Sequence, residues 1–198
     1  PGVATPVHLE ARSETGKRLH AVDGAMLCTH FGLSGPAGLD VSRHWILDGG
    51  DLFVSWLPDE DATSVDAALR DLRGANPLGW VQARLPKRLA DVLVRMAGID
   101  PEARHVDLTK AQRKALVTAL VDARLPVEGP RGWTWAEVTA GGVPLREVRL
   151  ESMASRACDG LYLCGEILDV DGRIGGFNFQ WAWASGTVVG RALGDVCS

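Results

Sequence analysis

The segment from residue 160 to 190 constrains the fold more than any other part of this chain. A short apolar run, residues 161–164, stops at Gly165, as a buried parallel strand does at its carboxyl end. Gly175 and Gly176 then precede a stretch of small residues that suits a helix packed closely on a sheet or a ligand. The segment predicts a strand, an acidic turn and a helix, at the sheet edge where α/β folds collect ligands.

The residue types in this turn fit a flavin. Glu166 follows the strand directly, and a carboxylate there can accept hydrogen bonds from ribityl hydroxyls. Gly175 and Gly176 carry no Cβ where the helix begins, so backbone can lie against a flat ring. The free N–H groups and positive dipole of the helix start favour the negative charge of a reduced flavin. The segment thus predicts half of a flavin site, although an ordinary strand–turn–helix shares the pattern.

Four ordered motifs resemble those of a known flavoprotein family. They are THFGLSGPAGLD at 29–40, LPKRLADVL at 85–93, AEVTAGGV at 136–143 and GLYLCGEILDVDGRIGGFNFQWAWASG at 160–186. In this order they resemble the bacterial aminoacetone-oxidase-like flavoproteins, a group that includes bile-acid-pathway flavin reductases. The resemblance extends over nearly the whole chain. It implies an FAD-dependent oxidoreductase that transfers hydride between flavin and a small organic substrate.

The resemblance also implies which residues bind FAD. The 139–142 turn is similar to a glycine turn that approaches the isoalloxazine in related flavoproteins, and residues without a Cβ suit that approach. Residues 152–156 read Ser-Met-Ala-Ser-Arg where relatives have Thr-Met-Glu-Ser-Lys, so a contact through that carboxylate does not carry over. The residues expected to bind the cofactor are Gly141, Gly142, Gly165, Glu166, Gly175, Gly176, Phe177 and Asn178.

One expected motif is missing from the sequence. Family members begin with a strand, a GxGxxG turn and a helix that take the FAD pyrophosphate, and the glycines at 172–176 have the wrong spacing for it. The chain also opens at Pro1. We therefore expect a C-terminal portion of a longer flavoprotein, or a split-gene product, whose partner is the missing N-terminal FAD-binding half. Alone, the chain should bind FAD weakly or not at all and should be inactive.

Residue patterning predicts an α+β fold. Alternating apolar residues at 7, 9 and 11, an Asp23-Gly24 hairpin, a strand at 26–29 and a strand pair across 44–57 predict an antiparallel β barrel or sandwich. A helical insert follows, and then the C-terminal strand and helix of a Rossmann-like FAD domain. The expected parts are a β-rich insert domain (1–57), a helical insert (58–126), a returning β segment (127–155) and the C-terminal part of the FAD-binding domain (156–198).

Helical periodicity marks the middle third of the chain. Leu89, Val92, Leu93 and Met96 are spaced to share one buried face. Thr109, with a glutamine three residues on, forms a capping box that starts another helix. Elsewhere, Ser34 can cap a short helix that has Pro36 near its first position, and Trp133 and Trp135 alternate as in a strand.

Composition restricts the class of protein. The 198 residues are 46% hydrophobic and 23% charged, which suits a core-forming protein. The net charge of −4 disfavours nonspecific nucleic-acid binding. No apolar run approaches the roughly 20 residues of a spanning helix, and no signal peptide is visible, so we expect a cytoplasmic protein without membrane contact. Cys28, Cys158, Cys164 and Cys197 form no CxxC pair, so we expect reduced, buried thiols and no metal site. Dithiol chemistry of Cys158 and Cys164 beside the flavin is the alternative.

No catalytic residue can be assigned from the sequence. His30 is the most suitable base by residue type, but a structural histidine has the same signature. Arg84, Lys87 and Arg88 could attract an acidic substrate or the phosphate of NAD(P)H, or serve solubility alone. Either oxygen or NAD(P)H would complete the redox cycle. Two non-enzymatic alternatives stay open: an interaction or regulatory module derived from such a flavoprotein, and a β domain at 1–57 that binds a small ligand.

Overall fold

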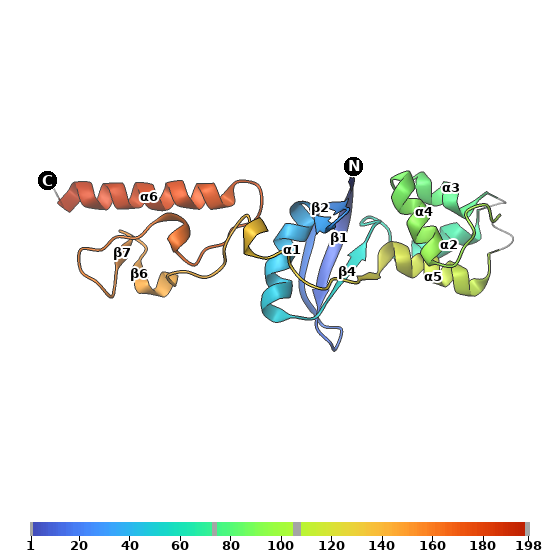
Figure 1. The fold of residues 1–198 in the computed structure, drawn as a ribbon, viewed down its shortest axis with the longest axis horizontal. Coiled ribbons are helices and arrows are strands. Elements are labelled where there is room, and N and C mark those ends of the chain that lie inside the picture. The colour runs from blue at the N-terminus through green and yellow to red at the C-terminus, as the bar shows by residue number, and fades with distance from the viewer. Residues whose placement is uncertain (1, 73–74, 105–107, 197–198) are drawn as a thin grey trace. The chain divides into compact units, whose positions relative to one another are not determined.

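The computed structural model describes residues 2–72, 75–104 and 108–196, and the chain divides into two compact units (Figure 1). Unit 1 spans Pro1–Gly129 and unit 2 spans Pro130–Ser198. The finer division of the chain at residues 57, 126 and 155 stays a prediction.

An antiparallel sheet forms the first part of unit 1. Its order is β3-β2-β1-β4-β5, so β3 and β5 are the end strands and no barrel closure occurs among the described strands. Val7, Leu9 and Ala11 on β1 are buried, as their alternation predicts. The strands are β1 (Val3–Arg12), β2 (Arg18–Thr29), β3 (Gly32–Ser34), β4 (Asp51–Ser55) and β5 (Ala123–Leu125).

The predicted hairpin at Asp23-Gly24 is wrong. β2 runs through both residues without a break, and Gly24 pairs with Val7 of β1. A Cβ on Gly24 would lie 3.6 Å from the Cβ of Ala37, on helix α1 (Gly35–Asp48). Gly24 therefore lies within a strand that packs against α1, and not in a turn.

The predicted strand pair across 44–57 is wrong in its first half. Residues up to Asp48 belong to α1, and only β4 is a strand. Ser34 does occupy the N-cap position, without a side-chain cap bond, and Pro36 lies in the first turn. The helix runs for 14 residues, longer than expected, because Ala37 and Val41 recur at i, i+4 spacing and are fully buried.

The described residues of unit 1 form four further α-helices: α2 (Ala62–Arg70), α3 (Pro77–Gln82), α4 (Lys87–Met96) and α5 (Lys110–Val121). The capping box that starts α5 is confirmed. The Gln112 N–H donates to Thr109 Oγ1 at 3.2 Å, and the Thr109 N–H donates to Gln112 Oε1 at 3.1 Å. The buried side chains of α5, with those of α2, α4 and the sheet, form one continuous core.

The predicted buried face of α4 is only partly correct. Leu93 is buried, but the Val92 side chain is 50% exposed and the Met96 side chain 72%. Ala90 and Val94 are buried instead. The buried face of α4 is therefore centred on Ala90, Leu93 and Val94.

Unit 2 packs a long helix, α6 (Phe177–Val196), along short irregular segments (Figure 1). Its core is small: Val148, Met153 and Leu168 are buried, and Trp181 and Val188 of α6 pack on them. The other elements are η2 (Trp133–Trp135), η3 (Leu145–Glu147), β6 (Val148–Arg149), β7 (Ala154–Ser155) and η4 (Gly165–Ile167).

Two strand predictions in unit 2 are wrong. Residues 161–164 make a single antiparallel bridge, Tyr162 with Ala154, and Leu161 is 42% exposed. No parallel neighbour pairs with this segment among the described residues, so its apolar side chains have no sheet to pack in. Trp133 and Trp135 lie in a 3-10 helix and are largely exposed, and Arg131 stacks on the Trp135 ring at 3.6 Å.

The thiols are more accessible than expected. Cys28 is half-buried, and burial raises its pKa. Cys158 and Cys164 are exposed, which contradicts the expectation of buried thiols, and Cys197 lies outside the described residues. Across residues 2–72, 75–104 and 108–196, no cluster of three or more His, Cys, Asp or Glu side chains has a metal-binding arrangement. Over the same residues, every helix is too short or too polar to cross a membrane.

Candidate functional site

The eight residues predicted to bind the cofactor all fall in unit 2. Six of them belong to three glycine-containing turns: one around Gly141, one at Gly165 and one at residues 172–176, directly before α6. The other two, Phe177 and Asn178, are the first residues of α6. Each turn is held in place by a side chain from elsewhere in the unit.

The first turn lies alongside the segment that follows η4. The Val143 N–H donates to the carbonyl of Ile167 at 2.9 Å, and the Asp169 N–H donates to the carbonyl of Val143 at 2.9 Å. The Gly141 N–H donates to the Asp169 carboxylate, Oδ1, at 3.1 Å. Gly142 has φ 134°, and a Cβ there would lie 2.6 Å from the Ile167 carbonyl oxygen. Only glycine allows this close approach of two backbone segments.

The second turn is clamped by two side chains of α6. The Gly165 N–H donates to Ser185 Oγ at 2.9 Å, and Trp181 Nε1 donates to the Gly165 carbonyl at 3.2 Å. Ser185 is 1% exposed, and its hydroxyl donates to the Trp181 carbonyl at 2.7 Å. Of the two tryptophans of α6, Trp181 therefore packs inward, whereas Trp183 is 68% exposed.

The third turn leads into α6, which begins at Phe177 directly after the paired glycines, as predicted. Gly175 and Gly176 have φ values of 114° and 92°. The Gln180 N–H donates to the Gly176 carbonyl at 2.9 Å. The N–H groups of the first helical turn have no acceptor within their own helix, so the start of α6 is where a ligand could supply one.

The Asn178 side chain is bonded to the loop that precedes α6. Its Oδ1 accepts the Gly172 N–H at 2.6 Å, and its Nδ2 donates to the Gly172 carbonyl at 3.1 Å. Both ends of the amide are thereby used to close the 172–177 loop.

The surface over the glycines suits a flat ring. A Cβ built on Gly141 or on Gly176 would meet no atom within 4 Å, so neither backbone is covered by a tryptophan. Phe177 is 56% exposed, and the exposed rings of Phe179 and Trp183 stack at 6.1 Å. Glu166 is exposed in η4. Bare backbone, the start of a helix and exposed aromatic rings are features that fit an isoalloxazine.

Sequence reasoning missed the residues that hold these turns. Asp169, Trp181 and Ser185 act over 16 to 28 positions along the chain. One signal was available: a serine amid the apolar residues of a predicted helix needs a hydrogen-bond partner when buried.

The other titratable residues considered for function lie in unit 1. His30 is exposed, with its ring edge-on to Phe31 at 5.0 Å. Arg84 donates to Glu60 at 2.9 Å and lies over the Trp80 ring at 3.7 Å. Its charge is thus matched by a surface partner.

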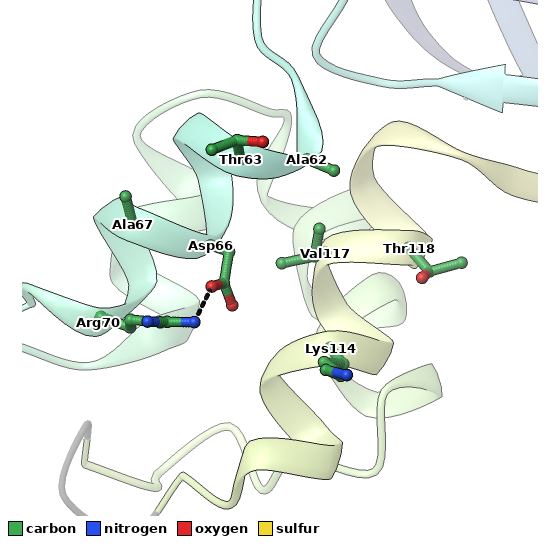
Figure 2. Close-up of a pocket in the computed structure, with 8 residues that line it drawn as sticks. All are labelled: Ala62, Thr63, Asp66, Ala67, Arg70, Lys114, Val117 and Thr118. Carbon is green, nitrogen blue, oxygen red and sulfur yellow. Dashed lines mark ion pairs between the residues drawn. The ribbon is translucent and has the colours of Figure 1, made fainter.

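A shallow groove between α2 and α5, also in unit 1, contains none of the predicted site residues (Figure 2). Asp66 lies in it and pairs with Arg70 of the same helix and with Arg113 of α5. The hydrogen bond from Arg113 lowers the pKa of the Asp66 carboxyl. Asp66 therefore links α2 to α5, and this structural role accounts for the charged side chains in the groove.

A row of charged side chains crosses one face of the sheet in unit 1. His8 Nδ1 lies 2.6 Å from an Asp23 oxygen and His8 Nε2 lies 3.1 Å from Glu10. Arg12 donates to Glu10 at 2.6 Å and pairs with Asp122 at 2.7 Å. Burial opposes the charge on His8, but the two carboxylates outweigh it, and the pKa of His8 is raised.

Comparison with known proteins assigns the chain to a family. Residues 10–192 match the HI0933-like protein Rossmann domain, and the chain belongs to this family of flavin-binding Rossmann domains. The predicted resemblance to FAD-type flavoproteins is thereby confirmed at family level.

Three curated relatives are similar over nearly all of the chain. A ribosomal RNA dihydrouridine synthase of Escherichia coli (strain K12) is 38% identical over 188 residues, 93% of this chain and 44% of that protein. A 3-dehydro-bile acid delta(4,6)-reductase of Clostridium scindens is 36% identical over 190 residues, 91% of this chain and 46% of that protein. A ribosomal RNA dihydrouridine synthase of Haemophilus influenzae is 33% identical over 188 residues. The chain spans less than half the length of these relatives.

Proposed function

We propose that this chain supplies the isoalloxazine-facing part of an FAD-dependent oxidoreductase. The observation that carries the proposal is the set of three glycine turns in unit 2, each held by a side-chain hydrogen bond, within a chain of the HI0933-like family. When bound, FAD supplies the ability to accept and donate a hydride. A further segment would bind the pyrophosphate side of the cofactor. It would correspond to the part of the longer relatives that this chain does not cover.

The residues would divide into contacts and supports. The backbones of Gly141, Gly175 and Gly176 would lie against the ring, because no Cβ keeps it away. The N–H groups at the start of α6 would favour negative charge on the ring, and Glu166 would accept a hydrogen bond from a ribityl hydroxyl. Asn178 would support the loop through Gly172 instead of contacting the cofactor directly.

For the substrate, we propose a small organic molecule with a carbon–carbon double bond conjugated to a carbonyl. The names of the relatives support this class, since forming dihydrouridine from uridine and reducing a 3-dehydro bile acid both saturate such a bond. A uridine within ribosomal RNA is the second candidate. Two of the relatives carry that name, one of them at 38% identity.

The test uses the complete protein that carries this chain. It should purify with visible flavin absorbance, and under anaerobic conditions its flavin should be reduced by NAD(P)H or a chemical reductant and then reoxidised by the true substrate. A panel of conjugated ketones is compared with unmodified ribosomal RNA. Flavin that is reoxidised by a ketone supports the first candidate, and flavin reoxidised by RNA alone supports the second. A colourless protein that binds no added FAD would instead indicate an interaction module.

A further inference from the structure

We propose that Asp169 is a positioning residue that holds the Gly141 peptide in the orientation the flavin requires. This inference rests on the function proposed above. The sequence does not suggest the role, because Asp169 follows η4 and lies 28 positions from the glycine it contacts.

The contacts around Asp169 connect the Gly141 turn to the segment that follows η4. Its carboxylate accepts the Gly141 N–H at 3.1 Å, and its own N–H donates to the Val143 carbonyl at 2.9 Å. The Val143 N–H in turn donates to the Ile167 carbonyl. The Asp169 carboxylate thus continues, through a side chain, a short parallel pairing of 143 with 168.

The two glycines of the turn are restrained in different ways. Gly142 is packed against the Ile167 carbonyl, with no room for a Cβ. Gly141 has φ 95° and open space on its Cβ side, so packing does not hold it there. A glycine with that freedom samples many backbone conformations unless a hydrogen bond selects one. The Asp169 carboxylate provides that bond, and it is charge-assisted.

Substitutions can distinguish a positioning role of the Asp169 carboxylate from a direct contact with the cofactor. Asparagine keeps an oxygen in the place of Oδ1 and can accept the same N–H, whereas alanine cannot. Asp159 is exposed in the same unit, carries the same charge and lies outside the three glycine turns, so it supplies a matched control.

The experiment compares Asp169→Ala, Asp169→Asn and Asp159→Ala in the complete protein. Two quantities are measured: amide hydrogen exchange of the peptide covering 139–143 without FAD, and the FAD dissociation constant. We expect Asp169→Ala to speed exchange and to weaken FAD binding by about tenfold, the loss of one hydrogen bond to a charged group. Asp169→Asn should restore both to within about threefold, and Asp159→Ala should change neither.

Each outcome decides the proposal. Faster exchange with weaker FAD binding, both rescued by asparagine, supports it. Unchanged exchange in Asp169→Ala overturns it, because the bond then does not order the turn. Faster exchange with unchanged FAD affinity also overturns it, because the turn is then ordered for another purpose. If the unaltered protein binds no FAD, the proposed function itself fails, and the exchange data show separately whether the carboxylate holds the turn.

Discussion

The hydroxyl of Ser185 accepts the N–H of Gly165 across 20 positions of sequence, at 2.9 Å. Ser185 is buried on α6, and Gly165 lies where the predicted flavin-binding turn begins. The position of this turn is therefore set by the helix that follows it.

Removing this hydroxyl should loosen unit 2. In Ser185→Ala the Gly165 N–H loses its partner, which should cost about 1–3 kcal/mol of stability. The measurement is hydrogen exchange of the α6 amides. Thr187→Ala is the control, because Thr187 also donates to a helix carbonyl, that of Trp183, but is exposed. Equal effects of the two substitutions would contradict the clamp.

Gly142 should tolerate substitution less well than any open glycine of the site. Gly142→Ala would place a Cβ 2.6 Å from the Ile167 carbonyl oxygen, at φ 134°. Overpacking and backbone strain together should destabilise unit 2 by at least about 2 kcal/mol. Gly141→Ala, at φ 95° with open space, should cost only the strain, roughly 1–2 kcal/mol. Chemical unfolding of the two variants gives the comparison, and a similar loss in both would argue against the contact.

Gly176→Val should abolish FAD retention in the complete protein. The branched side chain would project into the space over the start of α6, where we place the ring. Because φ is 92°, the substitution also strains the backbone, so Gly176→Ala serves as the control for strain alone. The ratio of flavin absorbance to protein after purification is the readout. Stoichiometric flavin in the valine variant would refute this placement.

The stability of unit 1 should depend on pH through the charged side chains of His8, Glu10 and Arg12 on the sheet. The pKa of His8 is raised above its ordinary value of 6.5, so its stabilisation is full below that value and is lost as pH rises through the folded pKa. Burial alone would raise the pKa of Glu10, but hydrogen bonds from Arg12 and His8 lower it below 4.5, so its stabilisation is lost only at more acid pH. Stability should be highest between these values.

The effect of His8 should be small, less than about 1 kcal/mol, because Asp23 is largely exposed to solvent. Thermal unfolding at pH 5.5 and 8 measures it, values chosen on either side of about 6.5. In His8→Gln the decline toward pH 8 should shrink, and a decline of the same size would show that other groups cause it.

The features that could be predicted from the sequence alone are local, because each depends on residues that lie close together in the chain. The capping box of Thr109 needs only residues three apart, the start of α6 needs only the glycines before Phe177, and the burial of Leu9 follows from strand alternation. In each case the hydrogen bond or the periodicity lies within one element, so no distant partner can change it. The family motifs likewise identified the flavoprotein class.

Which glycine lies in a turn and which permits a close contact depends on segments far apart in the sequence. Gly24 looks like a hairpin residue but lies within β2, and residues 161–164 look like a strand but lack a sheet. Gly142 permits the close approach of the Ile167 carbonyl, which its sequence neighbours do not reveal. The bonds of Asp169 and Ser185 to glycine N–H groups join segments 28 and 20 positions apart. The residues next to a glycine in the sequence do not reveal which segment approaches it in space. The absence of a Cβ matters only where another part of the chain packs against that glycine.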